Sequence, residues 1–391
     1  MSALPLHQGL AIVMVGLPAR GKTYIARKLG RYLSWLGHRA KVFNVGNYRR
    51  QRYGDHVPPS FFDPNNEEAW RQRRAVAGAA LDDLIQWCEE GGQIGIYDAT
   101  NSTRERRAYV RGRCEAAGLR VLFIETVCDD PAVIDVNIRE TKLSAPDYRD
   151  TDPDEATRDF RERLRHYERA YEPLSDDTQS FIKVIDVGRQ VVANRIVGHL
   201  AGRIVNYVMH LHPTPRPIWL TRHGESEANT RGLIGGDSSL SAAGEQYANS
   251  LRTFIADQDV ETLHVWSSTL QRTMQTAETV GRGFMAIKAL DEIASGVCDN
   301  MSYDAIRETM PREFAARQRD KLRYRYPRGE SYEDVIRRLD PLLIEVERHR
   351  EPLLIIAHQA VLRCLYAYLA DEPRERCPFL PVPLHTVIEL T

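Results

Sequence analysis

The feature that most constrains the fold is a continuous apolar run, Leu10–Val15, that leads directly into a glycine-rich turn. Such a run is typical of a strand buried on both faces of a parallel sheet. The turn, GLPARGKT over Gly16–Thr23, matches the phosphate-binding pattern G-x-x-x-x-G-K-[ST], and a helical spacing over Thr23–Trp35 follows it. A chance glycine turn is the alternative. The buried strand before the turn and the helix after it favour a phosphate loop, because such a loop needs both.

Two residues of this turn and one later aspartate carry the predicted chemistry. We expect Lys22 to reach the outer phosphates of a nucleotide and Thr23 to bind a magnesium ion (Mg²⁺). Asp98 directly follows the predicted strand Ile94–Tyr97, so a parallel topology would bring it to the same sheet edge. There it could hold Mg²⁺ through water or accept the proton of a substrate hydroxyl. An N-cap of the following helix is the alternative role for Asp98, and the two roles are compatible.

Strands and helices alternate through the first half of the chain, which indicates a doubly wound parallel sheet. Further strands are predicted at Lys41–Val45, Ile94–Tyr97, Arg120–Val127 and Ile182–Val187. Helices are predicted at Asn65–Cys88, Thr103–Ala117 with a cap in Asn101–Thr103, Pro131–Lys142, Asp154–Tyr171 and Val191–Val208.

A proline-rich segment, His210–Pro217, has three prolines in eight residues and marks the predicted domain boundary. A second alternating set begins after it, with strands predicted at Pro217–Leu220, Leu263–Trp266, Leu353–Ala357 and Thr386–Leu390. Its helices are predicted at Ser241–Asp257, Thr269–Val280, Ser302–Met310, Tyr332–Arg348 and Ala360–Leu369. A length of 391 residues suits two domains. We therefore expect an α/β protein of two doubly wound, three-layer domains, residues 1–212 and residues 213–391.

The second half opens with a different phosphate signature, the sequence LTRHGESEAN. A short strand delivers Arg222 and His223 together into a glycine-containing turn, where the guanidinium would bind phosphate oxygens while the neutral imidazole attacks phosphorus. Arg272 and His358 also follow predicted strands and would converge on the same phosphoryl group. Glu292 is the best candidate for the general acid that protonates the leaving oxygen. A surface loop carboxylate is the alternative for Glu292.

Charge and cysteine usage limit the classes of function. The formal net charge of −1 supplies no global field that would draw the chain to nucleic acid or to a membrane surface. Six scattered cysteines lack a C-x-x-C pair and any metal-ligand spacing, which fits reduced thiols in a cytoplasmic enzyme. The N-terminus lacks a basic region and predicts a strand, not a signal peptide, and no apolar segment has the length of a membrane span. Local arginine clusters suit small anionic substrates, although any single arginine is expected on a solvated helix face: Arg49, Arg50 and Arg52; Arg71, Arg73 and Arg74; Arg104, Arg106 and Arg107.

The motifs taken together resemble known families. TRHGESEAN, followed by SSTLQRTMQTAE, LDEI and AHQA, is similar to the histidine phosphatase superfamily, which includes the cofactor-dependent phosphoglycerate mutases. GLPARGKTY, FNVGNYRR and YDATNSTRERR, followed by a histidine phosphatase, resemble the bifunctional 6-phosphofructo-2-kinase/fructose-2,6-bisphosphatase family. The resemblance runs from about Leu10 to Thr391, with the motifs in the order of that family.

The resemblance implies a set of kinase residues. ATP is expected at the nucleotide-binding positions Gly16, Leu17, Pro18, Ala19, Arg20, Gly21, Lys22, Thr23, Tyr24, Asn137 and Lys142. Fructose 6-phosphate is expected at Arg49, Arg73, Thr100, Arg106, Lys142, Arg163 and Tyr167. Asp98 and Cys128 stand at kinase active-site positions, and for Cys128 the resemblance is the only argument, because taken alone it suits a small buried apolar residue. Mg²⁺ is expected at Thr23 and Asp98.

It also implies a set of phosphatase residues. His223 would accept the phosphoryl group and Glu292 would donate the proton. The 2-phosphate and the sugar would be surrounded by Arg222, Asn229, Gly235, Arg272, His358, Gln359 and Arg363. The other end of the bisphosphate would be held by Tyr303, Arg317, Lys321 and Tyr332, in a stretch that by itself predicts only a basic, tyrosine-bearing loop.

The activity that the resemblance implies is a pair of opposed reactions. The first domain would transfer the γ-phosphoryl group of MgATP to the C2 hydroxyl of fructose 6-phosphate. The second would hydrolyse that 2-phosphate through a phosphohistidine. A homodimer is implied as well. The terminal regulatory extensions of some relatives have no counterpart in this sequence, so we do not expect control by phosphorylation of such tails.

Three other functions remain open from the sequence. One half could be catalytically weak, leaving a mainly kinase or mainly phosphatase enzyme with a regulatory partner half. A kinase–phosphatase of nucleic-acid ends would need a basic groove and aromatic stacking platforms, and the near-neutral charge argues against it. A non-catalytic nucleotide sensor that regulates a mutase-like half is the third.

Overall fold

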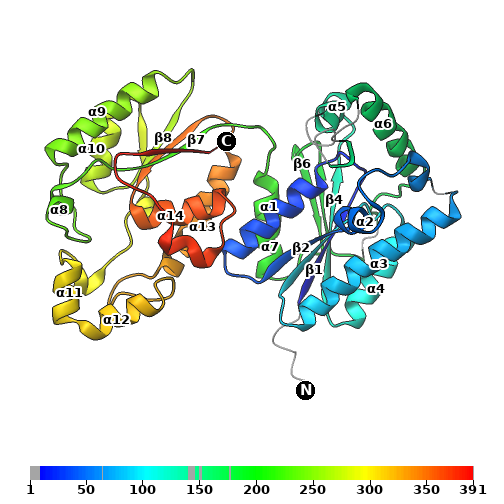
Figure 1. Cartoon of the computed structure of the whole chain (residues 1–391), viewed down its shortest axis with the longest axis horizontal. Helices are drawn as coiled ribbons and strands as arrows, with labels where there is room; N and C mark the ends of the chain where they lie inside the picture. Colours follow the sequence, from blue (N-terminus) through cyan, green and yellow to red (C-terminus); the bar gives the residue numbers. More distant parts are fainter. Residues whose placement is uncertain (1–8, 64, 140–145, 149–151, 176–177, 391) are drawn as a thin grey trace. The chain divides into compact units, whose positions relative to one another are not determined.

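The computed structural model describes residues 9–63, 65–139, 146–148, 152–175 and 178–390 of the chain. It divides between Leu211 and His212 into two compact units, each built on its own sheet. In Figure 1 the N-terminal unit runs from blue to green and the C-terminal unit from green to red.

The N-terminal unit contains a sheet of six strands in the order β2-β3-β1-β4-β5-β6. Its strands are β1 (Leu10–Val15), β2 (Ala40–Asn44), β3 (Ile94–Asp98), β4 (Arg120–Val127), β5 (Phe181–Ile185) and β6 (Gln190–Asn194). β1 to β5 pair in parallel, and β6 pairs antiparallel with β5. Every residue of β1 is buried, as expected for the central strand of a sheet covered on both faces.

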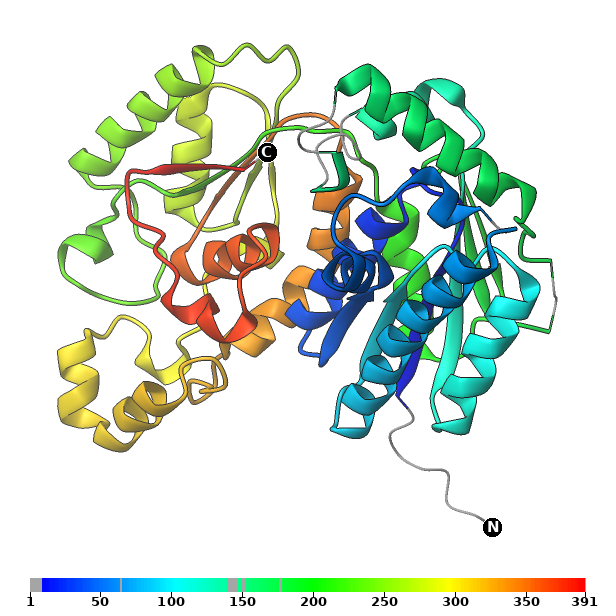
Figure 2. The same cartoon turned by 45° about the vertical axis from the view of Figure 1, so that its right-hand side comes forward.

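Helices cover both faces of this sheet (Figures 1 and 2). They are α1 (Lys22–Trp35), α2 (Val45–Tyr53), α3 (Glu67–Glu89), α4 (Arg104–Ala116), α5 (Pro131–Asn137), α6 (Pro153–Arg169) and α7 (His199–His210). Leu84 of α3 and Val110 of α4 pack against Phe123 and its neighbours on one face. On the other face α1 lies beside α7, where the rings of Tyr32 and Tyr207 stack with centroids 4.0 Å apart.

The prediction of a single helix over Val191–Val208 is wrong in its first part. Gln190–Asn194 forms β6 instead, and α7 begins at His199. The chain reverses between β5 and β6 through Val187 and Gly188, whose φ angles are +57° and +89°. Two adjacent valines then follow the turn, and β-branched side chains favour an extended strand over a helix. The apolar residues of the hairpin strand β6 therefore matched the helical spacing of α7 by chance.

The C-terminal unit contains a sheet of five strands in the order β11-β7-β10-β8-β9. Its strands are β7 (Ile218–Arg222), β8 (His264–Ser267), β9 (Phe284–Ala286), β10 (Leu353–Ala357) and β11 (Val387–Leu390). Its helices are α8 (Glu227–Thr230), α9 (Ala242–Ala256), α10 (Gln271–Val280), α11 (Tyr303–Thr309), α12 (Pro311–Arg319), α13 (Tyr332–Arg348) and α14 (Gln359–Leu369). β11 pairs antiparallel with β7, and the remaining neighbours pair in parallel.

This second sheet is also covered on both faces. Leu251 of α9 and Ala277 of α10 pack against Trp219 and Leu354 on one face. α13 and α14 pack against each other, and Figure 1 shows them on the opposite face. α11 and α12 stand beside this core, around a small cluster that includes Ile306. The predicted class, two doubly wound three-layer α/β units, is therefore confirmed, with antiparallel edge strands that the sequence did not indicate.

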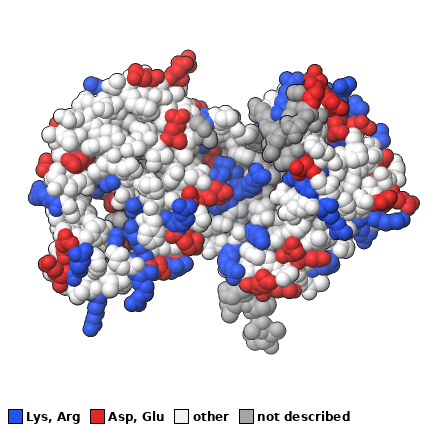
Figure 3. Space-filling view, viewed as in Figure 1, with Lys and Arg blue, Asp and Glu red and all other residues white. Residues whose placement is uncertain are grey.

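Most predicted elements are present with ends shifted by one or two residues, and the strands at Leu10–Val15, Arg120–Val127 and Leu353–Ala357 have the predicted ends. Thr103 caps α4, since its Oγ1 accepts a hydrogen bond from the N–H of Arg106 at 3.2 Å. The predicted cap in 101–103 is thus confirmed, and the alternative role of Asp98 as that cap is wrong. All six cysteines are free. Among the described helices, none combines the length and apolar character that crossing a membrane requires. Charges of both signs are interspersed over the face in Figure 3.

Leu84 offers a test of the core between α3 and β3. Its side chain is fully buried and packs over the bare backbone of Gly95, where a Cβ would lie 2.6 Å from the Leu84 Cγ. We expect Leu84→Ala to destabilise the N-terminal unit by about 2–5 kcal/mol, because the removed atoms leave a cavity. Calorimetric unfolding measures this loss. Val197→Ala, at a side chain that is 72% exposed, should cost less than about 0.5 kcal/mol. Equal effects of the two substitutions would contradict this packing.

Candidate active sites

The phosphate loop begins where β1 ends, and its first glycine has no space for a side chain. Gly16 has a φ of +133°, and a Cβ there would lie 2.5 Å from the carbonyl oxygen of Thr126. Its N–H donates to the carbonyl oxygen of Thr100 at 3.0 Å. Gly21, with a φ of +80°, forms the N-cap of α1. The loop is therefore held between two neighbouring strand ends and opens onto the N-terminus of a helix, the arrangement that binds phosphate.

Residues predicted for nucleotide binding lie around this loop. The Lys22 Nζ donates to the carbonyl oxygen of Leu17 at 2.5 Å, so the ammonium group lies over the loop itself. Asn137, at the end of α5, donates from Nδ2 to the carbonyl oxygen of Ala19 at 3.2 Å. Segments about 120 residues apart in sequence are thereby joined at one place. Lys142 lies outside the described residues.

Asp98 lies at the carboxyl end of β3 and is almost fully buried. Its Oδ2 accepts a short hydrogen bond from Nδ2 of Asn44, the residue directly opposite on β2. This bond fixes the direction of the carboxylate and occupies only one of its two oxygens. Cys128 follows β4 and is buried. Asn44 was not among the predicted site residues, although the sequence FNVGNYRR contains it.

Two of the arginines predicted for the sugar phosphate converge on a carboxylate. Asp147 accepts from Arg49 at 2.6 Å and from Arg50 at 3.2 Å, and Arg163 lies 3.6 Å from its other oxygen. Burial alone would raise the pKa of Asp147, but the charges of Arg49 and Arg163 outweigh it and the pKa lies below its ordinary value. The guanidinium of Arg163 also lies 3.9 Å from the ring centroid of Phe62. These side chains form a cluster that already balances one negative charge.

Three other predicted sugar-phosphate residues lie on helices: Arg73 on α3, Arg106 on α4 and Tyr167 on α6. Thr100 lies in the loop between β3 and α4, and Lys142 lies outside the described residues. Arg106 donates to the hydroxyl of Tyr97 at 2.7 Å. Arg73 donates to the carbonyl oxygens of Phe61 and Asp63. Tyr167 packs its ring 5.9 Å from that of Phe62, within a cluster that also holds Phe61. Phe62 thus lies against both Tyr167 and Arg163, so α6 and the segment before α3 meet at this cluster.

In the C-terminal unit His223 directly follows β7 and is only 3% exposed. Its Nδ1 lies 2.6 Å from the carbonyl oxygen of Gly224, and a carbonyl only accepts, so Nδ1 carries the proton. The Nε2 is then the unprotonated nitrogen, and it accepts from Nε of Arg272 at 3.1 Å. Burial and the charge of Arg272 lower the pKa of His223 to about 3. The imidazole is therefore neutral near pH 7, with its lone pair directed at a guanidinium.

Positive charge surrounds this imidazole. Arg272 is the second residue of α10, is 4% exposed and donates from NH1 to the carbonyl oxygen of Gly236 at 2.8 Å. Arg222 ends β7, and burial lowers its pKa, as it does for Arg272. Glu292 is half-buried, and its Oε1 accepts from the N–H groups of Ile293 at 2.9 Å and Ala360 at 3.2 Å. The surface-loop alternative for Glu292 is wrong, since its side chain is fixed beside these arginines and helps to line the cavity described below.

The second histidine, His358, follows β10 and is fully buried. Its ring centroid lies 5.0 Å from that of His223. Its Nε2 is hydrogen-bonded to Oγ of Ser268 at 2.7 Å, and Ser268 in turn to Oγ1 of Thr273 at 2.7 Å. Burial and the neighbouring Arg272 hold the pKa of His358 well below its ordinary value. The strand ends of β7, β8 and β10 therefore bring the two imidazoles together, as the sequence predicted, and burial opposes a positive charge on either ring.

A cavity of about 490 Å³ opens in front of His223. Twelve of the thirteen residues predicted for the phosphatase line it: Arg222, His223, Asn229, Gly235, Arg272, Glu292, Tyr303, Arg317, Lys321, Tyr332, Gln359 and Arg363. The thirteenth, His358, is not part of the cavity lining, and its ring centroid lies 5.0 Å from that of His223. Arg317 donates to the hydroxyls of Tyr326 at 2.8 Å and Tyr303 at 2.9 Å, so the far end of the cavity is basic and tyrosine-rich. The cavity thus has a neutral imidazole at one end and cations at the other.

Comparison with known proteins decides the family. Residues 4–215 match the 6-phosphofructo-2-kinase family, and residues 218–391 match the histidine phosphatase superfamily, branch 1. The chain is 51% identical over 385 residues to 6-phosphofructo-2-kinase/fructose-2,6-bisphosphatase 3 of Rattus norvegicus, covering 97% of this chain and 69% of that protein. The chain belongs to the 6-phosphofructo-2-kinase/fructose-2,6-bisphosphatase family. The human protein numbered 4 is 51% identical over 97% of this chain and 82% of its own length, and the protein of Arabidopsis thaliana is 50% identical over 97% of this chain and 52% of its own length.

Several residues of this family member lie at the sites but were not predicted. Ser226, Arg307, Tyr324 and Tyr326 line the phosphatase cavity, and Ser268 holds His358. The sequence could have indicated Arg307, because it lies four residues after the predicted site residue Tyr303 and therefore on the same face of α11. No feature of the sequence indicated Asp147, because its partner Arg49 lies far away in the sequence.

The protonation of His223 is directly measurable. We expect its ring nitrogens to show the neutral form, protonated at Nδ1, throughout pH 5–8, because burial and Arg272 oppose a positive charge. Nitrogen NMR of histidine-labelled protein measures this, and His223→Gln identifies the signal. A midpoint above pH 5 for His223 would contradict the geometry.

Proposed function

We propose that this chain both makes and degrades fructose 2,6-bisphosphate, with the reactions carried out by the residues described above. Family membership supports the pair of activities, and one observation carries the assignment of residues. That observation is the cavity in which a buried neutral imidazole faces two arginines at one end and a basic, tyrosine-rich cluster at the other. Such a cavity suits a sugar with a phosphate at each end. We assign the kinase to residues 1–212 and the phosphatase to residues 213–391.

In the kinase, ATP would bind with its phosphates on the loop from Gly16 to Thr23. Lys22 lies over that loop and supplies positive charge to the transferred group. Asp98, fixed by Asn44, lies at the neighbouring strand end and would accept the proton of the C2 hydroxyl of fructose 6-phosphate. The proton then leaves the attacking oxygen as the γ-phosphoryl group is transferred and ADP departs.

Mg²⁺ fits the oxygen donors at this edge, the Thr23 hydroxyl and the Asp98 carboxylate, since it prefers oxygen ligands. When bound, it would neutralise charge on the phosphates. Arg49 and Arg163 are among the residues that would hold the sugar phosphate. Both form ion pairs with Asp147, so an incoming phosphate would have to displace this carboxylate or share the two guanidinium groups with it.

In the phosphatase, Nε2 of His223 would attack the 2-phosphate. A new N–P bond forms while the bond from phosphorus to the C2 oxygen breaks, and Glu292 gives its proton to that oxygen. The phosphate oxygens would take over the N–H groups of Arg222 and Arg272, so Arg272 exchanges its bond to Nε2 for bonds to the phosphate. The substrate itself would therefore release the hydrogen bond from Arg272 to Nε2 of His223.

A second step would regenerate the enzyme. Water attacks phosphorus, Glu292 takes a proton from it, and the N–P bond breaks to leave inorganic phosphate and neutral His223. The bond from Nδ1 to the Gly224 carbonyl persists throughout and stabilises the positive charge on the phosphorylated ring. Arg317, Lys321 and Tyr303 would hold the 6-phosphate, keeping the C2 end at His223.

The alternatives receive no support. A weak half would be expected to lack part of a site, yet the loop, Asp98 and Asn44 are assembled in one unit and His223, Arg272 and Glu292 in the other. A nucleotide sensor would not require Asp98 to be positioned beside the loop. A cytoplasmic location and a homodimer are further parts of the proposal, resting on cysteine usage and on the family resemblance.

A product assay separates these possibilities. With ATP, Mg²⁺ and fructose 6-phosphate, we expect an acid-labile fructose bisphosphate to accumulate more with His223→Ala than with the wild type, because only the phosphatase is lost. Lys22→Ala should abolish its formation while leaving hydrolysis of added fructose 2,6-bisphosphate intact. Glu292→Gln should slow that hydrolysis by about 10²–10⁴-fold. Failure of both wild type and His223→Ala to form any sugar bisphosphate would overturn the kinase assignment.

The protonation of Lys321 is expected to make substrate binding by the phosphatase depend on pH. Burial and the charges of Arg363 and Arg317 lower its pKa to about 8, so the ammonium group is charged below that pH and neutral above it. For the phosphatase, kcat/KM should therefore fall as pH rises through about 8, since a cation that holds the 6-phosphate is lost. Lys321→Arg should move this fall to higher pH, because arginine stays charged. An unchanged profile in that variant would show that Lys321 does not bind the phosphate.

A further inference from the structure

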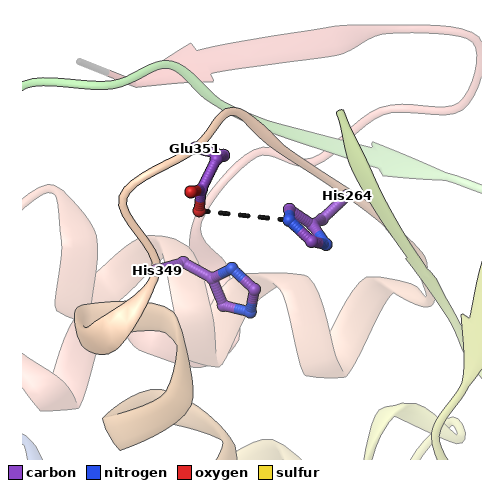
Figure 4. A group of neighbouring side chains, drawn as sticks. All are labelled: His264, His349 and Glu351. Carbon is purple, nitrogen blue, oxygen red and sulfur yellow. Dashed lines mark ion pairs between the residues drawn. The ribbon is translucent and has the colours of Figure 1, made fainter. Parts of the chain in front are cut away.

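A group of metal-ligating side chains lies in the C-terminal unit away from the phosphatase site (Figure 4). His264 is the first residue of β8, and His349 and Glu351 lie in the turn between α13 and β10. The catalytic histidines follow the carboxyl ends of β7 and β10, whereas this group lies at the amino ends of the parallel strands β8 and β10. It is therefore at the opposite edge of the sheet and takes no part in phosphoryl transfer.

The three side chains face one another closely. The ring centroids of His264 and His349 are 4.7 Å apart, and Nε2 of His264 lies 4.0 Å from a carboxylate oxygen of Glu351. One donor atom from each of the three residues lies within 4.8 Å of the other two. Around a tetrahedral zinc ion, donor atoms are roughly 3.3 Å apart, as follows from bonds of about 2.0–2.2 Å. Small side-chain rotations would close this difference.

The backbone that presents these side chains is fixed. The N–H of His264 donates to the carbonyl oxygen of Pro352 at 3.0 Å, and the N–H of His349 to that of Glu345 at 3.1 Å. The carbonyl oxygen of His349 accepts from Nε2 of His212 at 2.6 Å. The side chains of His264 and Glu351 are 42% and 50% exposed, so an ion has a direct route from solvent. The group thus combines a rigid frame with open access.

The charges also suit a cation. The carboxylate of Glu351 lies 4.0 Å from Nε2 of His264 and supplies negative charge beside the two imidazoles. Glu345 lies 3.7 Å from Nε2 of His349 and offers a further carboxylate, as a fourth ligand or as the group that orients the ring.

We propose that His264, His349 and Glu351 bind one divalent transition-metal ion, with zinc as the best fit. Two imidazoles and a carboxylate suit zinc better than magnesium or calcium, which prefer oxygen ligands alone. The ion would join the start of β8 to the turn before β10. It stabilises the folded C-terminal unit by binding to it and leaves the phosphatase chemistry unaltered.

Zinc binding by the full chain, prepared without a histidine tag, tests this. Equilibrium dialysis against zinc alone should show one more tightly bound ion in the wild type than in His264→Gln. The affinity of that site should fall by more than about tenfold, since losing even a residue that only orients a ligand costs this much. His56→Gln, at an exposed histidine outside the group, is the matched control and should bind like the wild type. Zinc held by the phosphatase histidines or by thiols is common to all variants and cancels in the comparison.

Glu351→Gln provides a second variant whose folding is not in question, because its side chain lies at the surface. It too should bind zinc more weakly, and added zinc should raise the thermal unfolding temperature of wild type and His56→Gln more than that of either ligand variant. Equal zinc content and equal thermal shifts in all four proteins would overturn the proposal and leave the group as a surface histidine–glutamate pair.

Discussion

The proposed phosphatase mechanism depends on a single buried hydrogen bond, the one from Nδ1 of His223 to the carbonyl oxygen of Gly224. It fixes the proton on one ring nitrogen and so leaves the lone pair on the other, where Arg272 and then a phosphate can reach it. The bond depends on the fold, since β7 must end where its chain turns beneath β10 and α10. Close backbone packing keeps this turn in place: a Cβ at Gly224 would lie 2.3 Å from the carbonyl oxygen of Gly244.

The kinase unit and the phosphatase unit both have to present positive charge to a phosphate group, and they do so with different groups. In the proposed kinase site this charge comes from backbone N–H groups and Lys22 at a helix N-terminus, whereas in the proposed phosphatase site it comes from buried arginines. In each half a polar neighbour holds the reacting group in one direction: Asn44 for Asp98, and Gly224 for His223. In both proposed sites, positively charged groups would bind the phosphate, while a hydrogen bond fixes the direction of the reacting side chain.

Residues that lie within a continuous motif could be predicted from the sequence. Gly16 directly follows β1, and Arg222 ends β7 with His223 directly after it, so the position of both motifs at a sheet edge follows from local order alone. The helix assigned over Val191–Val208 failed because an apolar spacing does not show where a chain reverses. Asp147 could not be found, since its role arises from arginines on α2 and α6 that only the tertiary fold brings together. The proposed zinc ligands have the same origin: His264 begins β8 and His349 lies in the turn before β10, and the pairing of β8 with β10 brings them together.

The central claim is that a neutral His223 accepts the phosphoryl group, and the most direct test is to trap that intermediate. Protein mixed with fructose 2,6-bisphosphate labelled at the 2-phosphate, then quenched in alkali within its first turnovers, should carry label that is stable to base and lost in acid. Mass spectrometry should place it on His223, with none on His358. Absence of any covalent label during active hydrolysis, or its location on His358, would contradict the mechanism and point to direct attack by water or to the other imidazole.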